Sequence, residues 1–141
     1  MKKITFALFM LVLFMNPLFA KLVTETKALQ VAQHFYNQNT TAKAFTATLV
    51  NTETDASGIA VYYVFNMNTK EGFVIISAED AINPVIGYSL NNGFVKPGAN
   101  TTIASWLNLF KKEISTLRKR NSVATDDIKK EWEGYFINSL N

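Results

Sequence analysis

The sequence lacks cysteine entirely and has one histidine, His34, among its 141 residues. The missing cysteines exclude disulfides, thiolate metal sites and a cysteine nucleophile within this chain. A single histidine also excludes a metal site that needs two imidazoles of this chain. His34 lies beside Phe35 in a segment with helical spacing, so we interpret it as an ordinary surface or boundary residue. The fold must therefore be held together by packing.

Other arrangements that carry chemistry are also missing. The six glycines are scattered, so the sequence has no glycine-rich loop to bind phosphate. Residues 87–91 read GYSLN and lack the second glycine of a nucleophile elbow. Glu79 and Asp80 are adjacent, and neighbouring side chains of an extended chain point to opposite sides. We expect Asp80 to accept backbone N–H groups in a local turn. We predict no enzyme activity, no cofactor and no metal.

The first twenty residues have the layout of a bacterial secretory signal peptide. Two lysines precede an uncharged apolar run over 4–15, and the small residue Ala20 precedes Lys21. The run is shorter than the roughly 20 residues that a membrane span needs. We predict cleavage after Ala20, which leaves a single domain at residues 21–141. The mature protein would be exported to the periplasm or the extracellular space, with no stable membrane anchor after cleavage.

The charge of the chain argues against a nucleic-acid partner. Without the two lysines of the signal peptide, 12 basic residues stand against 11 acidic ones, a net charge of about +1. The one dense basic cluster, at residues 118–120, falls at the predicted end of a helix, where cations complement the helix dipole. We interpret this cluster as a solvated helix end, and we expect no nucleic acid to bind.

Alternating and continuous apolar runs predict a sheet. The predicted strands are residues 45–50, 60–66, 72–77, 85–90 and a short run at 94–95. The third run, FVIIS after Gly72, is apolar at consecutive positions, which is typical of a strand covered on both faces. Because turn residues separate the runs, we expect an antiparallel four- to five-stranded sheet.

Apolar residues at spacings of three and four predict three helices. The first covers residues 24–37, the second begins near Thr101 or Thr102, and the third begins near Thr125 or Asp126. The apolar stripe of the second helix consists of Ile103, Leu107, Phe110, Ile114 and Leu117. The fold class is therefore α+β, with the N-terminal helix and the two C-terminal helices packed on one side of the antiparallel sheet.

Four segments give the chain a specific resemblance. They are YVFN at 63–66, GFVIIS at 72–77 followed by Asp80, PVIGYS at 84–89, and IASW at 103–106. In their order and separation they resemble the inhibitory prosegment of streptopain-family cysteine proteases, which also occurs as the free-standing Spi-type protease inhibitor. The resemblance covers most of residues 21–141. It implies a secreted inhibitor that blocks the active-site cleft of a streptopain-like, papain-fold cysteine protease without a covalent bond.

The resemblance also implies a contact site. In streptopain zymogens the loop before the Ile-Ala-Ser helix enters the active-site region, where an asparagine disturbs the catalytic arrangement. The matching residue here is Thr102, and the loop is one residue longer, so Asn100 can supply the side chain from a shifted position. In a competing interpretation Thr102 is only the helix N-cap and the contact lies elsewhere. The predicted protease-contacting loop consists of Lys96, Pro97, Gly98, Ala99, Asn100, Thr101 and Thr102.

Three functions remain open at this point. The chain ends at Asn141, where a zymogen would continue into a catalytic domain, which favours a free-standing inhibitor. A second possibility is a helper that assists protease folding in trans, as a prosegment does in cis. A third is a secreted binding module that keeps the fold without inhibiting. Inhibition, improved refolding or no binding of a streptopain-like protease would distinguish the three.

Overall fold

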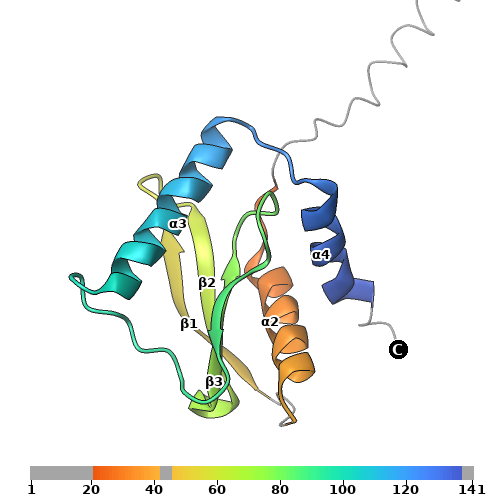
Figure 1. Cartoon of the computed structure of the whole chain (residues 1–141), viewed down its shortest axis with the longest axis vertical. Coiled ribbons are helices and arrows are strands. Elements are labelled where there is room, and N and C mark those ends of the chain that lie inside the picture. Colours follow the sequence, from red (N-terminus) through yellow and green to blue (C-terminus); the bar gives the residue numbers. More distant parts are fainter. Residues whose placement is uncertain (1–20, 42–45, 138–141) are drawn as a thin grey trace, which may run out of the picture.

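The computed structural model describes residues 21–41 and 46–137, so the predicted signal peptide and Phe45 lie outside the described residues. The elements in chain order are α2 (Glu25–Asn39), β1 (Ala47–Thr54), β2 (Ala60–Met67), the 3-10 turn η2 (Asn68–Lys70), β3 (Gly72–Ser77), β4 (Val85–Ser89), α3 (Thr102–Lys119) and α4 (Asp126–Ile137). This arrangement, shown in Figure 1, confirms the predicted α+β class.

The sheet has four strands in the order β1-β2-β3-β4, and every neighbouring pair is antiparallel. The central strands β2 and β3 are paired along their lengths, from Tyr62 opposite Ser77 to Met67 opposite Gly72. Strand β1 continues to Thr54, beyond the predicted end at residue 50. The polar residues of its second half still pair with β2 through the backbone. Polar side chains are tolerated there because one face of an antiparallel edge strand can lie in solvent.

The predicted short strand at 94–95 is wrong. Residues 93–98 are irregular, and the backbone N–H of Phe94 donates to the side-chain Oδ1 of Asn66 at 2.7 Å. A side chain therefore takes the place that a strand partner would have, and the sheet ends at β4.

The prediction that all helices lie on one side of the sheet is also wrong. Helices α2 and α4 cover one face and α3 covers the other, as Figure 1 shows. Strand β2 is apolar on both faces: Tyr63 and Phe65 belong to the core under α2, whereas Tyr62 and Val64 belong to the core under α3. The apolar residues of β2 and β3 at successive positions require cover on both sides.

The close packing of β3 against β4 and α2 explains the glycine that opens β3. A Cβ on Gly72 would lie 2.5 Å from the carbonyl oxygen of Ser89 and 2.6 Å from the ring of Tyr36. Both neighbours are fixed, since one is backbone and the other is a fully buried ring. The glycine of the GFVIIS segment is thus required by the fold.

No helix within residues 21–41 and 46–137 is both long and apolar enough to cross a membrane.

Candidate functional site: the loop before helix α3

The loop at residues 96–102, which we call the contact loop, lies at the surface between the sheet and the first turn of α3. Its side chains are exposed except for that of Pro97, which is half-buried. Figure 1 shows the long connection from the sheet to α3 running along the outside of the molecule. The predicted contact residues are therefore together and accessible, as a site for another protein requires.

Thr101 fixes the end of the contact loop. Its hydroxyl donates to the carbonyl oxygen of Gly98 at 2.8 Å and accepts from the N–H of Ala104 at 3.2 Å, and its own N–H donates to the same oxygen of Gly98. Thr101 is thus the N-cap of α3, and Thr102 is the first helical residue. The interpretation of Thr102 as the helix N-cap is wrong.

Asn66 fixes the start of the loop segment. This residue of β2 is 6% exposed, and its Oδ1 accepts the Phe94 N–H described above. The ring of Phe94 packs edge-on against Phe73, with 5.4 Å between centroids. The chain is therefore held two residues before the contact loop begins. Asn66 was not predicted as an anchor, because its partner Phe94 lies 28 positions along the chain.

Asn100 lies between these anchors and Thr102 directly follows the second one, and both side chains are exposed. Neither side chain donates to or accepts from any other residue in the described part of the chain. Their polar groups do not contribute to the fold in the way that Thr101 does. Both side chains are consequently available to a partner protein.

A hollow of about 330 Å³ lies beneath the contact loop. Its wall includes Tyr62 of β2, Leu107 of α3 and Phe94, together with Pro97 and Ala99 of the loop itself. An ion pair between Lys111 Nζ and Glu53 Oε1, at 2.6 Å, ties α3 to β1 nearby. The contact loop is therefore held at its ends, and the hollow separates its middle from part of the domain surface below it.

Large apolar side chains flank the contact loop at the surface. Val95 is 83% exposed, Ile103 is 60% exposed and Trp106 is 40% exposed. The prediction that Ile103 belongs to the buried stripe of α3 is wrong, because its side chain is exposed at the start of the helix; Leu107 and Ile114 are buried as expected. Exposed apolar residues grouped beside an accessible loop are typical of a protein-binding surface.

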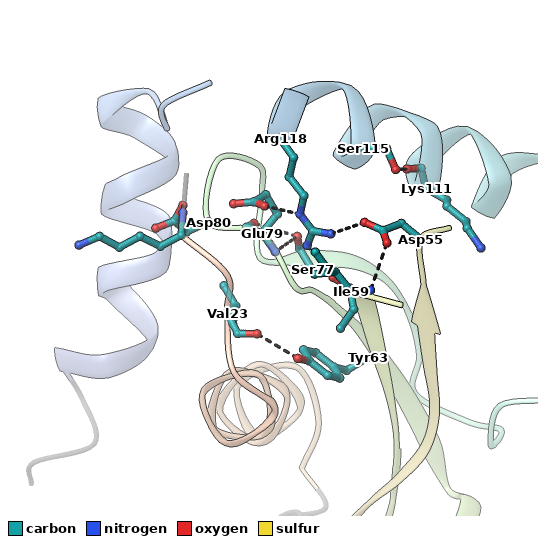
Figure 2. A network of polar contacts seen from close by, with 12 residues as sticks. Val23, Asp55, Ile59, Tyr63, Ser77, Glu79, Asp80, Lys111, Ser115 and Arg118 are labelled. Atoms are coloured by element: carbon teal, nitrogen blue, oxygen red, sulfur yellow. Dashed lines mark hydrogen bonds and ion pairs between the residues drawn. The ribbon is translucent and has the colours of Figure 1, made fainter. Parts of the chain in front are cut away.

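A second polar arrangement lies at the other end of α3, around Arg118 (Figure 2). The Arg118 Nε donates to Oε2 of Glu79 at 2.8 Å, one terminal nitrogen donates to Oδ2 of Asp55 at 3.1 Å, and the other donates to the carbonyl oxygen of Ala60. The Arg118 side chain is 17% exposed. The interpretation of cluster 118–120 as a solvated helix end is therefore wrong for Arg118, which joins α3 to the sheet.

The two carboxylates around Arg118 differ in their pKa. Burial raises the pKa of Glu79 above its usual value of 4.5, and the Arg118 guanidinium opposes that rise. The pKa of Asp55 is lowered from 3.8, first by the N–H of Ile59 and further by the N–H of Ser57 and by Arg118. Glu79 is 1% exposed, and its Oε1 has no hydrogen-bond partner among the described residues. The arrangement is structural, because its groups are used in holding three elements together.

Asp80 does not have the local role that the sequence suggested. Its Oδ1 accepts from the backbone N–H of Lys21 at 2.7 Å, a residue 59 positions earlier. It does accept a backbone N–H, as predicted, but it fastens the N-terminal segment to the chain after β3. Glu79 contacts Arg118 instead, so the two adjacent carboxylates do not meet at one site.

The described residues hold no group of three side chains suited to a metal ion. His34 packs edge-on against Tyr135, with 5.6 Å between ring centroids, and is half-buried. This contact agrees with its interpretation as a boundary residue.

Comparison with known proteins adds two findings. Residues 20–114 match the sequence model of a family described as Spi protease inhibitor. Over 134 residues the chain is 29% identical to the thiol protease/hemagglutinin PrtT of Porphyromonas gingivalis, which covers 92% of this chain and 15% of that protein. The chain thus spans a small part of the length of this relative. No solved structure matches the chain.

Proposed function

The chain belongs to the Spi protease inhibitor family, and from this premise we propose that it inhibits a streptopain-like, papain-fold cysteine protease. The inhibitor would occupy the active-site cleft of that protease with the contact loop, residues 96–102. The relative PrtT, named as a thiol protease, supports a target of the cysteine class. The contact loop and both of its anchors lie within the matched residues 20–114.

The observation that carries this proposal is an exposed loop held at both ends. Asn66 holds the chain at Phe94, and Thr101 holds it at the start of α3. A loop fixed in this way loses little conformational freedom when it binds, so more of the contact energy remains as affinity. The apolar residues Val95, Ile103 and Trp106 beside it would be covered by the protease.

The inhibition would be steric and non-covalent. The chain has no cysteine that could form a mixed disulfide with the protease. The side chains of Asn100 and Thr102 are exposed and make no hydrogen bond within the described part of the domain. We assign to them the contact with the catalytic groups of the protease. The anchored loop would resist cleavage because its ends cannot follow the distortion that a transition state requires.

The inhibitor would act outside the cytoplasm. Residues 1–20 would direct export and be removed, and residues 21–141 would form the single inhibitory domain. A producing cell would be protected from a protease exported by the same route.

Two other functions are separated from inhibition by one experiment. The purified exported protein is incubated with a streptopain-like protease, and substrate hydrolysis is measured as a function of inhibitor concentration. Saturable inhibition supports the proposal. Faster recovery of activity from unfolded protease, without inhibition of the native enzyme, supports a folding helper instead. Absence of binding to either form of the protease would leave a secreted binding module.

A further inference from the structure

The N-terminal segment of the described chain is fastened to the turn after β3. Leu22 and Glu79 form an antiparallel bridge, and the N–H of Val23 donates to the carbonyl oxygen of Ala78 at 2.9 Å. Val23 is 3% exposed, and its carbonyl oxygen accepts from the hydroxyl of buried Tyr63, as Figure 2 shows. The position of this segment is thus set by backbone pairing and by a core contact.

Lys21 closes this pairing with a ring of two hydrogen bonds to Asp80. The Lys21 N–H donates to Oδ1 of Asp80 at 2.7 Å, and the Asp80 N–H donates to the carbonyl oxygen of Lys21 at 3.2 Å. Glu79 is paired with Arg118 from the other side. The carboxylate of Asp80 is therefore directed at one backbone nitrogen, that of Lys21.

We propose that Asp80 is the binding site for the mature N-terminus, which signal-peptide removal creates at Lys21. The inference rests on the export and cleavage included in the proposed function. Hydrolysis of the Ala20–Lys21 peptide bond consumes one water, leaves a carboxylate on Ala20 and frees an amine on Lys21. That amine takes up a proton at neutral pH, since an α-amino group titrates near pH 8. The nitrogen at 2.7 Å from Asp80 then carries a full positive charge.

Cleavage thus changes a hydrogen bond between a neutral amide and the Asp80 carboxylate into an ion pair between an ammonium and the same carboxylate. The charge added on the donor strengthens its attraction to the carboxylate, by the modest amount that is typical of an ion pair at an exposed position. The precursor has the weaker bond and the mature protein has the stronger one. Full stability is reached only after export, so the precursor is easier to keep unfolded for translocation.

The charge of the terminus gives the clamp a pH dependence of known sign. The group in contact with it is the Asp80 carboxylate, and the neighbouring Glu79 carboxylate is paired with the Arg118 guanidinium. A carboxylate next to an ammonium favours the protonated amine. The stabilisation is therefore complete below about pH 8 and is lost as the amine deprotonates at higher pH.

The test uses the full precursor, exported by a bacterial host and purified from outside the cytoplasm. The variant has Gly-Ser inserted between Ala20 and Lys21, so that cleavage after Ala20 puts the ammonium two residues away and leaves Lys21 with a neutral amide. The wild type and the insertion variant are made with Asp80 and with Asp80→Asn. Intact mass gives the N-terminus of each protein, and thermal melting is followed by circular dichroism.

The proposal predicts a mature mass that begins at Lys21 and an insertion variant that melts roughly 2–4 °C lower at pH 7. The insertion should have no effect in the Asp80→Asn background, and the wild-type advantage should disappear by about pH 10. An equal loss with and without Asp80, a loss that persists at high pH, or no loss at all would overturn the clamp. A terminus at another residue would overturn it too, and would leave the inhibition assay unaffected as a test of the proposed function.

Discussion

Arg118 and Glu79 form an ion pair between the last turn of α3 and the chain after β3, with 2.8 Å between Nε and Oε2. The Glu79 side chain is 2% exposed and that of Arg118 is 17% exposed, so the pair lies inside the domain. A buried ion pair of this kind adds little net stability to the folded protein. Removal of one partner is nevertheless strongly destabilising, because it leaves the other charge buried and unpaired. The pair ties the C-terminal end of α3 to the chain after β3, at the opposite end of the helix from the contact loop.

Arg118→Met should therefore destabilise the protein by about 2–4 kcal/mol, less than a fully buried pair because solvent reaches part of Arg118. The measurement is urea unfolding at pH 7. Arg118→Met with Glu79→Leu should recover most of the loss, because no unpaired charge then remains. Lys119→Met, at the exposed neighbouring position, is the matched control and should change stability by less than about 0.5 kcal/mol. Equal effects of the two single variants would contradict the role of Arg118.

Acid should act on Glu79 and Asp55 in opposite directions. The folded-state pKa of Glu79 is raised above 4.5, so the native protein binds more protons there than the unfolded chain does. Stability from this group consequently falls as the pH rises through that range. The folded-state pKa of Asp55 is lowered from 3.8, so its stabilisation is present above that pH and is lost as the pH falls.

Unfolding of the wild type, Glu79→Gln and Asp55→Asn from about pH 2 to about pH 7 checks both signs. Relative to the wild type, Asp55→Asn should be less stable at neutral pH, and the difference should vanish in acid. The free energy of unfolding of Glu79→Gln, relative to that of the wild type, should be more favourable at neutral pH than in acid. The same trend in both variants would show that one of the two assignments is wrong.

Gly72 and Gly98 form a matched pair for a packing test. Gly72→Ala should cost about 1–3 kcal/mol, because the new methyl meets the Ser89 oxygen and the buried Tyr36 ring. Gly98→Ala should be near neutral, since its Cβ would meet only Thr101 Cγ2, at 3.8 Å. Thermal unfolding of both variants measures the difference. Similar melting temperatures would contradict the close approach of β3 to β4 and α2.

Asn66→Ala tests the anchor before the contact loop. The Phe94 N–H would lose its acceptor, which costs about 1–3 kcal/mol when the group is buried. Inhibition of the protease should weaken as well, because the loop would have to be ordered on binding. Asn92→Ala, at an exposed turn position, is the control and should alter neither property. Loss of stability with an unchanged inhibition constant would mean that the anchor serves the fold and not the site.

The elements were largely predictable because their signals are local. Helix α2, the central strands and the starts of α3 and α4 follow from apolar spacing within each segment. The side of the sheet on which each helix packs was predicted wrongly, although residues 72–77 were correctly interpreted as covered on both faces. That interpretation, extended to β2, would have required helices on both sides.

The contact loop was located from a resemblance, whereas its supports depend on partners distant in sequence. Asn66 reaches Phe94 across 28 positions and Arg118 reaches Glu79 across 39. Nothing local in the sequence distinguishes an asparagine that accepts a partly buried backbone N–H from one in solvent. For the same reason the basic cluster was expected to be solvated throughout, and Asp80 was assigned a local turn.

The central claim is that Asn100 and Thr102 of the contact loop carry the inhibition. The most direct test is the inhibition constant of Asn100→Ala/Thr102→Ala against a streptopain-like cysteine protease, with folding verified by thermal unfolding. The control is Lys130→Ala/Glu133→Ala, which changes two exposed positions of α4 on the opposite face of the sheet. The account predicts inhibition at least about tenfold weaker, or about 1.4 kcal/mol, for the loop variant and unchanged inhibition for the control. An inhibition constant equal to that of the wild type in the folded loop variant would contradict it.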